Sequence, residues 1–380
     1  MTEAAPPLQR VPDAKKPILE RMRFSDIASW RDDDHRAAFA TFLAGARLIA
    51  ETPPKARALG IAGIGLQRVA RAALALAEPQ TGEAARSFFE RWFVPHRINA
   101  RGFVTGYYEP EVEASREPTA RFSVPLYRRP ADLVDFGEME RPPGWDPEMR
   151  FARRTEAGLE PFFDRAAIEE GALAGRGLEL AFVESSVDAF FIHVQGSARL
   201  KLVDGNEGGK TLRIAFDGKA GHPYTSIGRL AVERGILSRD KADKDGLEAW
   251  LKSHPDKGRA LMRENRSFIF FRETELDDAA GPLGAAGISL TAHRSLAVDR
   301  TLHTFHTPIF VEAPDLHDPE QDDKAFRRLM IAQDTGSAIV GAARGDIFFG
   351  AGQAAGSRAG RVRHAATMIV LIPAACAAPE

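Results

Sequence analysis

Apolar positions recur at helical spacing over the first hundred residues of the chain. In the first of these segments, acidic residues stand just before the apolar stripe, where they suit the positive end of a helix dipole. That stripe consists of Phe39, Phe42, Leu43 and Ile49. The spacing predicts amphipathic helices over residues 36–50, 66–77 and 82–94.

Beyond residue 103 the pattern changes to short apolar runs separated by turn residues, which is typical of β-strands. The strands are predicted at 103–110, 189–195, 198–203, 212–216, 267–272, 309–312, 328–333, 346–349 and 367–372. We predict turns at Asp204–Gly205 and Asp217–Gly218, and short helices over 227–234 and 247–253. The short strands and Gly-rich loops of the C-terminal part favour a compact β-barrel.

The composition of the chain indicates a leader and a linker that bound these predicted elements. Residues 1–19 contain four prolines and several charges, and we interpret them as a mobile leader. An acidic, Ala- and Gly-rich stretch over 273–281 indicates a linker. The first ten residues show neither the apolar core of a signal peptide nor a lipobox cysteine, so none is predicted there. The chain also has no run of 18 apolar residues that would predict a membrane-spanning helix.

Charge and cysteine content exclude several classes of function. The chain has 380 residues, of which 44% are apolar and 27% charged, as in ordinary globular proteins. Its 51 basic and 53 acidic residues give a net charge of −2, without the basic excess of a general nucleic-acid binder. The single cysteine, Cys376, rules out an intramolecular disulfide and a Cys-rich metal site.

Three aspartates in the last hundred residues are candidates for chemistry: Asp299, Asp334 and Asp346. Asp334 ends one predicted strand and Asp346 begins another, each beside apolar residues. Burial beside apolar groups raises the pKa of a carboxyl, so that it stays protonated near neutral pH and serves as a general acid. The simpler interpretation is that these aspartates cap turns, as most Gly-Asp pairs do.

The same aspartates also allow two other interpretations, an aspartic protease and a metal site. Asp-Thr-Gly at 334–336 is the aspartic-protease signature, but a pepsin-sized chain would carry it twice, and here it occurs once. His293, His303 and His306 share a segment with Asp299, but their spacing matches no metal motif. We expect His303 and His306 to be polar loop residues before Pro308.

Two polar segments resemble the edge of a sugar site. Tyr107 and Tyr108 are adjacent on a predicted strand, so their side chains point to opposite faces, and one can pack while the other faces a groove. The chain has four tyrosines in all, which makes this pair conspicuous. A second polar edge is predicted at His193, Gln195 and Ser197. Both segments are equally compatible with ordinary packing.

Six segments in series are similar to the MltA family of lytic murein transglycosylases, which carries a three-aspartate (3D) domain. The segments are Thr-Gly-Tyr-Tyr-Glu-Pro at 105–110, Val-Gln-Gly-Ser at 194–197, Tyr-Thr-Ser-Ile-Gly at 224–228, Asn-Arg-Ser-Phe-Ile-Phe-Phe at 265–271, Ala-Gln-Asp-Thr-Gly-Ser-Ala-Ile at 332–339 and Gly-Asp-Ile-Phe-Phe-Gly at 345–350. Each is modest alone, but their order makes the resemblance specific.

The resemblance implies an α+β fold, mainly β with N-terminal helices. A double-psi β-barrel would form from residues 20–109 and 277–380. A smaller β-barrel over 110–276 would be inserted into it, with a glycan groove between the two.

The resemblance also implies roles for individual residues. Asp346 would be the catalytic acid and then the base, and Asp334 would orient it or tune its charge. The substrate's own C6 hydroxyl would be the nucleophile, so neither a metal nor another cofactor is expected. The residues expected to bind substrate are Thr105, Tyr107, Tyr108, Glu109, Gln195, Ser197, Asp299 and Gly336.

The implied substrate is the β-1,4 bond between N-acetylmuramic acid and N-acetylglucosamine in peptidoglycan. We expect a monomer in the periplasm, associated with the outer membrane, whose partners are glycan strands and wall-remodelling proteins. A non-catalytic peptidoglycan-binding protein of the same fold is the alternative, and the intact aspartates argue against it.

Overall fold

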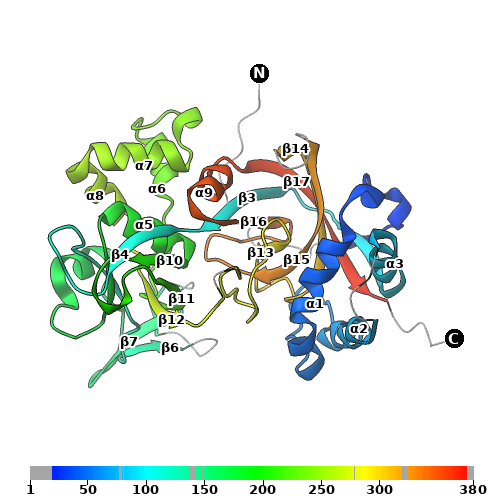
Figure 1. Ribbon diagram of the computed structural model, residues 1–380, viewed down its shortest axis with the longest axis horizontal. Helices are drawn as coiled ribbons and strands as arrows, with labels where there is room; N and C mark the ends of the chain where they lie inside the picture. The colour runs from blue at the N-terminus through cyan, green and yellow to red at the C-terminus, as the bar shows by residue number, and fades with distance from the viewer. Residues whose placement is uncertain are drawn as a thin grey trace.

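A computed structural model describes residues 19–76, 79, 81–136, 142–146, 149–277, 279–318 and 324–374. The predicted leader, apart from Leu19, and Cys376 lie outside these residues. The chain forms a central barrel with helices on one side and a second sheet with its own helices on the other (Figure 1).

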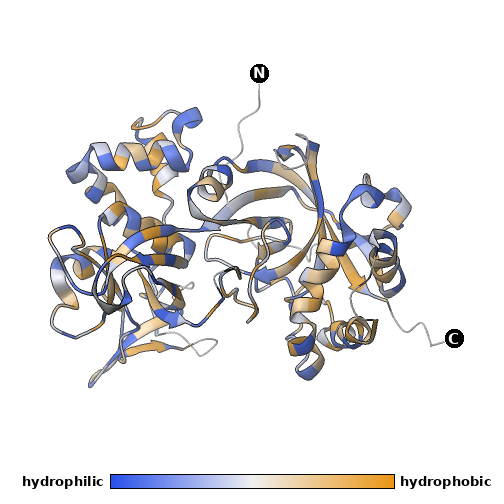
Figure 2. Ribbon diagram, in the orientation of Figure 1, coloured by the Kyte–Doolittle hydropathy of each residue, from blue (hydrophilic) through white to orange (hydrophobic). Residues whose placement is uncertain are grey.

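The three predicted N-terminal helices are confirmed as α1 (His35–Glu51), α2 (Gly63–Leu76) and α3 (Gly82–Trp92). Asp34 caps α1 by accepting hydrogen bonds from the first backbone amides of that helix. Their buried phenylalanines pack edge to face, with the rings of Phe39 and Phe88 4.9 Å apart. Hydrophobic and hydrophilic residues alternate along α1 and α2 in Figure 2, as amphipathic helices require.

The barrel is a closed ring of six strands in the order β17-β14-β15-β13-β16-β3, with β3 pairing back onto β17. Its strands are β3 (Gly102–Glu109), β13 (Ser295–Val298), β14 (Pro308–Asp318), β15 (Lys324–Asp334), β16 (Arg344–Ala351) and β17 (Arg363–Pro373). Outside β17 lie β2 (Phe93–Ile98) and β1 (Leu19–Arg21). Helix α9 (Gly352–Gly360) packs against β3 and β16. The predicted C-terminal barrel is therefore confirmed.

A second sheet has the strand order β12-β11-β10-β4-β9-β5. Its strands are β4 (Glu111–Ser115), β5 (Val124–Tyr127), β9 (Glu179–Val183), β10 (Ser197–Leu202), β11 (Thr211–Lys219) and β12 (Ile269–Thr274). A bridge between Arg128 and Phe271 joins its two edge strands, so this sheet also curls into a barrel-like body. The predicted fold class, mainly β with N-terminal helices, is thus correct.

Smaller elements complete the fold. A three-stranded sheet consists of β6 (Leu133–Asp135), β7 (Phe151–Thr155) and β8 (Gly158–Glu160). The further helices are α4 (Arg165–Ala167), α5 (Ser186–Gln195), α6 (Ile227–Glu233), α7 (Lys244–Ser253) and α8 (Pro255–Arg263). Short helical turns are η1 (Phe24–Asp26), η2 (Trp30–Asp32), η3 (Ile168–Ala172), η4 (Gly205–Glu207) and η5 (Arg239–Lys241).

Two local predictions are wrong. Residues 189–195 form part of helix α5 instead of a strand, because a continuous apolar run suits a buried helix as well as a buried strand. Ser185 caps this helix, which a strand would not need. The turn predicted at Asp217–Gly218 lies inside β11, where a bulge shifts the register between Phe216 and Gly218. The turn at Asp204–Gly205 is confirmed by the left-handed backbone of Gly205.

The chain passes from the barrel into the second sheet between Glu109 and Glu111 and returns after Thr274. All strands of the second sheet lie between these two crossings. The exact division into residues 110–276 and the remainder stays a prediction.

A buried ion cluster ties both crossings together. The carboxylate of Glu109, at the end of β3, accepts hydrogen bonds from Arg199 on β10 at 2.8 Å and from Arg213 on β11 at 3.0 Å. Arg199 and Arg213 also donate to the backbone carbonyl of Ala280 on the returning segment. Glu109 is only 1% exposed, so its charge depends on these two guanidinium groups.

We predict that Glu109→Gln destabilises the fold by about 3–5 kcal/mol, because it leaves the buried Arg213 and the partly buried Arg199 without their carboxylate. Chemical denaturation would measure the free energy of unfolding. The matched control is Glu113→Gln, which breaks an ion pair with Arg121 whose side chains are about half exposed, so it should cost far less stability. Equal losses of stability in both variants would contradict a stabilising role for the buried ion cluster.

Candidate active site

The barrel register aligns the candidate residues in one row across five neighbouring strands. Thr105 on β3 lies opposite Arg363 on β17 and opposite Asp346 on β16. Asp346 lies opposite Ala297 on β13, which in turn lies opposite Asp334 on β15. Directly paired residues share one face of a sheet, so these side chains emerge on the same face.

The carboxyl of Asp346 lies in a partly buried, hydrogen-bonded position. The hydroxyl of Thr105 donates to its Oδ1 at 2.5 Å. Burial raises the pKa of Asp346 to about 6, against the opposing attraction of the nearby Arg344 guanidinium. A carboxyl with this pKa is about one tenth protonated at pH 7 and mostly protonated below pH 6, which makes it available as a general acid.

Asp334 has a separate set of donors. The phenol of Tyr107 donates to its Oδ2 at 3.0 Å and the backbone amide of Ala285 to its Oδ1 at 3.0 Å. Burial raises the pKa of Asp334, and these hydrogen bonds partly offset that effect. Burial and the two carboxylates hold the pKa of Tyr107 well above its usual value, so the phenol stays a neutral donor.

The two carboxyls do not form the shared-proton pair of an aspartic protease. One strand, β13, lies between the strands that carry them, which separates the backbones by about 9–10 Å. Each carboxyl also has its own hydroxyl donor. The geometry therefore suits one acid and one supporting carboxyl.

Asp299 organises the loop between the two aspartates, and its predicted contact with substrate stays a prediction. It is 7% exposed and accepts hydrogen bonds from the amide and hydroxyl of Thr301 and from the amide of Gly341. Gly341 has a φ of 120°, which favours glycine. Gly336, on the same loop, is exposed and remains available to a ligand.

The tyrosine pair divides as strand alternation predicts. Tyr107 faces Asp334, whereas Tyr108 is buried against Gly356 of α9, where a Cβ atom would lie 2.7 Å from the Tyr108 ring. The backbone amide of Tyr108 donates to Gln195, and Ser197 is buried at the start of β10.

Our expectation that Glu109 and Tyr108 line a groove needs correction, because both side chains are buried among protein partners. Glu109 pairs with Arg199 and Arg213, and Tyr108 packs against helix α9. For Gln195 and Ser197, contact with substrate stays a prediction. The polar edge that they were predicted to form with His193 on a strand lies instead on α5 and the start of β10.

Sequence reasoning missed two side chains beside Asp346. Arg344 precedes it by two residues, which places both on the same face of β16. Tyr224, in the loop before α6, lies close enough for the charge of Asp346 to add to the effect of burial in raising the Tyr224 pKa. Strand alternation indicates Arg344, and Tyr224 stands in one of the matching segments, so both signals were present in the sequence.

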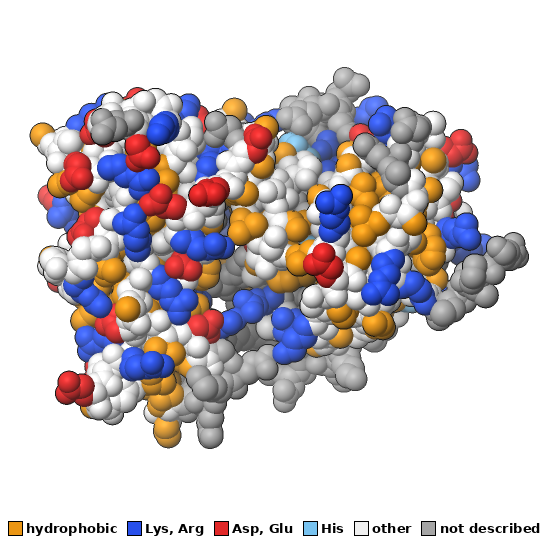
Figure 3. Space-filling view, turned by 60° about the horizontal axis from the view of Figure 1, so that its bottom comes forward, with side chains coloured by type: hydrophobic (Ala, Val, Ile, Leu, Met, Phe, Trp, Pro, Cys, Tyr) orange, Lys and Arg blue, Asp and Glu red, His pale blue; other side chains and the backbone are white. Residues whose placement is uncertain are grey.

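Lys219 reaches from the second sheet to the aspartate loop. Its Nζ donates to the hydroxyl of Ser337 at 3.0 Å. Lys219 and Tyr224 therefore both come from the part of the chain between the two crossings, and both lie beside the row of barrel residues. Acidic and basic side chains are interspersed on the face of the molecule in Figure 3, without a continuous patch of either charge.

His303 and His306 are buried loop residues before Pro308, and the prediction that they lie in a loop is confirmed. Burial lowers the pKa of His306 to about 4, and that of His303 also falls, so both are neutral. His303 contacts the carbonyl of Ala342 at 2.7 Å. Within the described ranges, no group of three or more His, Cys, Asp or Glu residues is placed to hold a metal ion.

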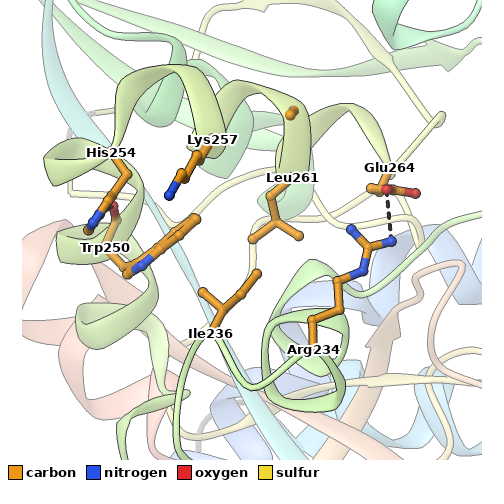
Figure 4. A pocket seen from close by; sticks show the side chains of 8 residues that line it. Arg234, Ile236, Trp250, His254, Lys257, Leu261 and Glu264 are labelled. Atoms are coloured by element: carbon orange, nitrogen blue, oxygen red, sulfur yellow. Dashed lines mark hydrogen bonds and ion pairs between the residues drawn. The ribbon is translucent and has the colours of Figure 1, made fainter.

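A separate hollow of about 340 Å³ lies among α6, α7 and α8. Trp250 and Leu261 form its apolar wall, and Arg234 pairs with Glu264 at 2.8 Å on its rim (Figure 4). Glu264 is the one carboxyl among the lining residues, and it is engaged by this arginine. The acid chemistry therefore belongs to the barrel row.

None of the helices in the described part of the chain combines the length and hydropathy needed to cross a bilayer.

Two family models match the chain: the MltA specific insert domain over residues 103–272 and the 3D domain over residues 294–372. The fold is similar to the crystal structure of a membrane-bound lytic murein transglycosylase from Agrobacterium tumefaciens. The two are 44% identical with a TM-score of 0.85, and the match covers 93% of this chain and 97% of that one.

Two more distant relatives add a ligand and a sequence match. The structure of Escherichia coli MltA with bound chitohexaose is 25% identical with a TM-score of 0.61, and the match covers 96% of this chain and 93% of that one. Membrane-bound lytic murein transglycosylase A of Vibrio cholerae is 33% identical over 264 residues, or 68% of this chain. That match spans 62% of the Vibrio protein, just under two thirds of its length.

We predict that Asp346→Asn raises the melting temperature at about pH 8 and that the gain disappears below about pH 4. The folded-state pKa of about 6 exceeds the ordinary value of 3.8. The native state therefore loses stability as the pH rises through this window and the buried carboxyl ionises, whereas asparagine stays neutral. Thermal unfolding followed by circular dichroism would measure the difference.

The exposed Asp315→Asn on β14 is the control, and its melting temperature should follow that of the wild type at both pH values. A pH-independent effect of Asp346→Asn would show that the carboxyl has an ordinary pKa.

Proposed function

The chain belongs to the MltA family, and on this basis we propose that it is a lytic transglycosylase acting on peptidoglycan. The bond cleaved is the β-1,4 bond between N-acetylmuramic acid and N-acetylglucosamine. The observation that carries the proposal is the pKa of Asp346, which is raised to about 6 beside a hydroxyl donor, in a family whose named members are murein transglycosylases.

In the first step, the protonated carboxyl of Asp346 gives its proton to the bridging oxygen. The bond from that oxygen to C1 of N-acetylmuramic acid breaks, N-acetylglucosamine leaves with a free hydroxyl, and positive charge develops at C1. Asp346 becomes a carboxylate, which the hydroxyl of Thr105 stabilises by its hydrogen bond.

In the second step, the C6 hydroxyl of the same N-acetylmuramic acid attacks C1, and Asp346 accepts its proton. The product is a 1,6-anhydro ring, and the enzyme returns to its protonated form without a net change in protons. Because the nucleophile is part of the substrate, attack is intramolecular and needs no second carboxylate to activate water.

Asp334 has a supporting role in this mechanism. Tyr107 and the amide of Ala285 hold its carboxyl in place. From there its negative charge adds to the burial that keeps the pKa of Asp346 high. It sits too far away to share the transferred proton.

We further propose that the glycan lies in a groove between a barrel domain, residues 20–109 and 277–380, and an inserted domain, residues 110–276. The chitohexaose bound in the structure of the Escherichia coli relative supports a glycan site. Tyr224 and Lys219 reach the acid and its loop from the second sheet, and the exposed Gly336 lies on the same loop. These residues, with Gln195 and Ser197 as further candidates, would contact the sugars.

The compartment follows from the substrate. We propose that the protein acts in the periplasm, where peptidoglycan lies, in association with the outer membrane. The relatives from Vibrio cholerae and Escherichia coli are named membrane-bound, which supports a membrane association. Proteins of a wall-remodelling complex would be its further partners.

Digestion of purified sacculi should release muropeptides with 1,6-anhydro ends, lighter by one water than the reducing ends that a hydrolase leaves. Mass spectrometry of the products measures this difference. Asp346→Asn should reduce release by a factor of about 100 or more, the range for loss of a general acid, and circular dichroism should show that the variant stays folded.

Reducing ends would make the protein a hydrolase, and binding of sacculi without any product would make it a non-catalytic binder. Full activity of Asp346→Asn would show that another residue is the general acid.

The rate should also fall as the pH rises through about 6, because the acid must be protonated and its pKa is about 6. Initial rates on soluble glycan strands between about pH 4 and about pH 8 would show this limb, provided that the protein stays folded throughout. A rate that still increases above neutral pH would contradict a carboxyl proton donor.

A further inference from the structure

The side chain of Arg344 reaches the hydrogen-bond partner of the proposed acid. Its Nη2 donates to Oγ1 of Thr105 at 2.6 Å, and its Nη1 donates to the backbone carbonyl of Gly345. The guanidinium also lies 5.7 Å from the centre of the Phe103 ring. Burial lowers the pKa of Arg344, but the group remains a cation at any pH of interest.

This contact determines the direction of the Thr105 hydroxyl. A guanidinium can only donate hydrogen bonds, so Oγ1 of Thr105 accepts from Arg344. The single hydroxyl proton of Thr105 is therefore free to point to Oδ1 of Asp346, 2.5 Å away. In turn, Oδ1 acts as an acceptor, which leaves the acidic proton of Asp346 on Oδ2.

We propose that Arg344 is a positioning residue that acts through Thr105 to assign the transferable proton to Oδ2 of Asp346 and to stabilise the carboxylate left after transfer. This inference rests on the proposed function. It adds that the acid is directional: only one of its two oxygens is the donor.

The charges around Asp346 support the second half of the proposal. Arg344 is the one cation among the described groups that act on the pKa of Asp346, and it opposes burial and the charge of Asp334. Tyr107 and Tyr224 lie close enough for the charge of Asp346 to raise the pKa of each phenol, and both phenols stay neutral. Removing Arg344 therefore takes away the attraction that keeps the acid strong enough to protonate a glycosidic oxygen.

The test compares Arg344→Ala, Arg344→Lys and Thr105→Val. Arg344→Ala should lower kcat about 10- to 100-fold, the range for loss of a charge-assisted hydrogen bond, with little change in KM. It should also shift the basic limb of the pH–rate profile to higher pH, because the pKa of Asp346 rises when the cation is lost. Arg344→Lys keeps the charge but not the fork of donors, so its limb should stay near that of the wild type while kcat falls.

Positioning and structural roles are separated by two further readouts. Adding guanidinium ion should restore part of the kcat of Arg344→Ala, and Arg344→Ala should cost less in the Thr105→Val background, because Thr105 carries the effect. The matched control is Arg361→Ala, whose side chain is 68% exposed and lies 4.0 Å from Asp245. It should leave the rate and the pH profile unchanged.

Failure of this inference can be told from failure of the proposed function. Carboxyl NMR of labelled aspartate follows the titration of Asp346 without any substrate, and Arg344→Ala should raise its pKa. If the wild-type protein is inactive but Arg344→Ala still raises the pKa of Asp346, the proposed function is wrong and the link between Arg344 and Asp346 stands. An active wild-type protein whose Arg344→Ala variant keeps kcat, pH profile and carboxyl titration would overturn the inference.

Discussion

The site depends on the pairing of one strand, β3, with two others. Parallel pairing with β16 and antiparallel pairing with β17 close the ring of six strands. The same pairing brings Thr105 and Tyr107 to aspartates that lie 241 and 227 residues further along the chain. Without closure, Asp346 and Asp334 would have neither hydroxyl donors nor the burial that changes their pKa values.

The acid at Asp346 results from a balance between opposing effects. Burial favours the neutral carboxyl, whereas the Thr105 hydroxyl and the Arg344 cation favour the carboxylate. Both forms are needed if one group is to give a proton and then take one back. A site with burial alone would hold the proton too tightly, and a fully solvated site would lose it at neutral pH.

Regular periodicity made much of the fold predictable: α1 to α3 and five of the six barrel strands have clear patterns of their own, whereas β13 (Ser295–Val298) was not predicted. The row of Thr105, Asp346 and Asp334 was visible through the motifs around them. By contrast, the burial of Glu109 depends on arginines 90 and 104 residues away, which no local pattern reveals. Helix α9, rich in glycine and alanine, was missed because its packing against Tyr108 outweighs its weak helix propensity.

Barrel closure by β3 also constrains the order of folding. Every strand of the second sheet lies between residues 111 and 274, so that sheet can assemble from its own segment. The barrel needs β3 and β17 together, and this pairing closes a loop of more than two hundred residues. Such high contact order makes the barrel the slow step. Until then β3 has open edges, and the chain is most exposed to aggregation before the site exists.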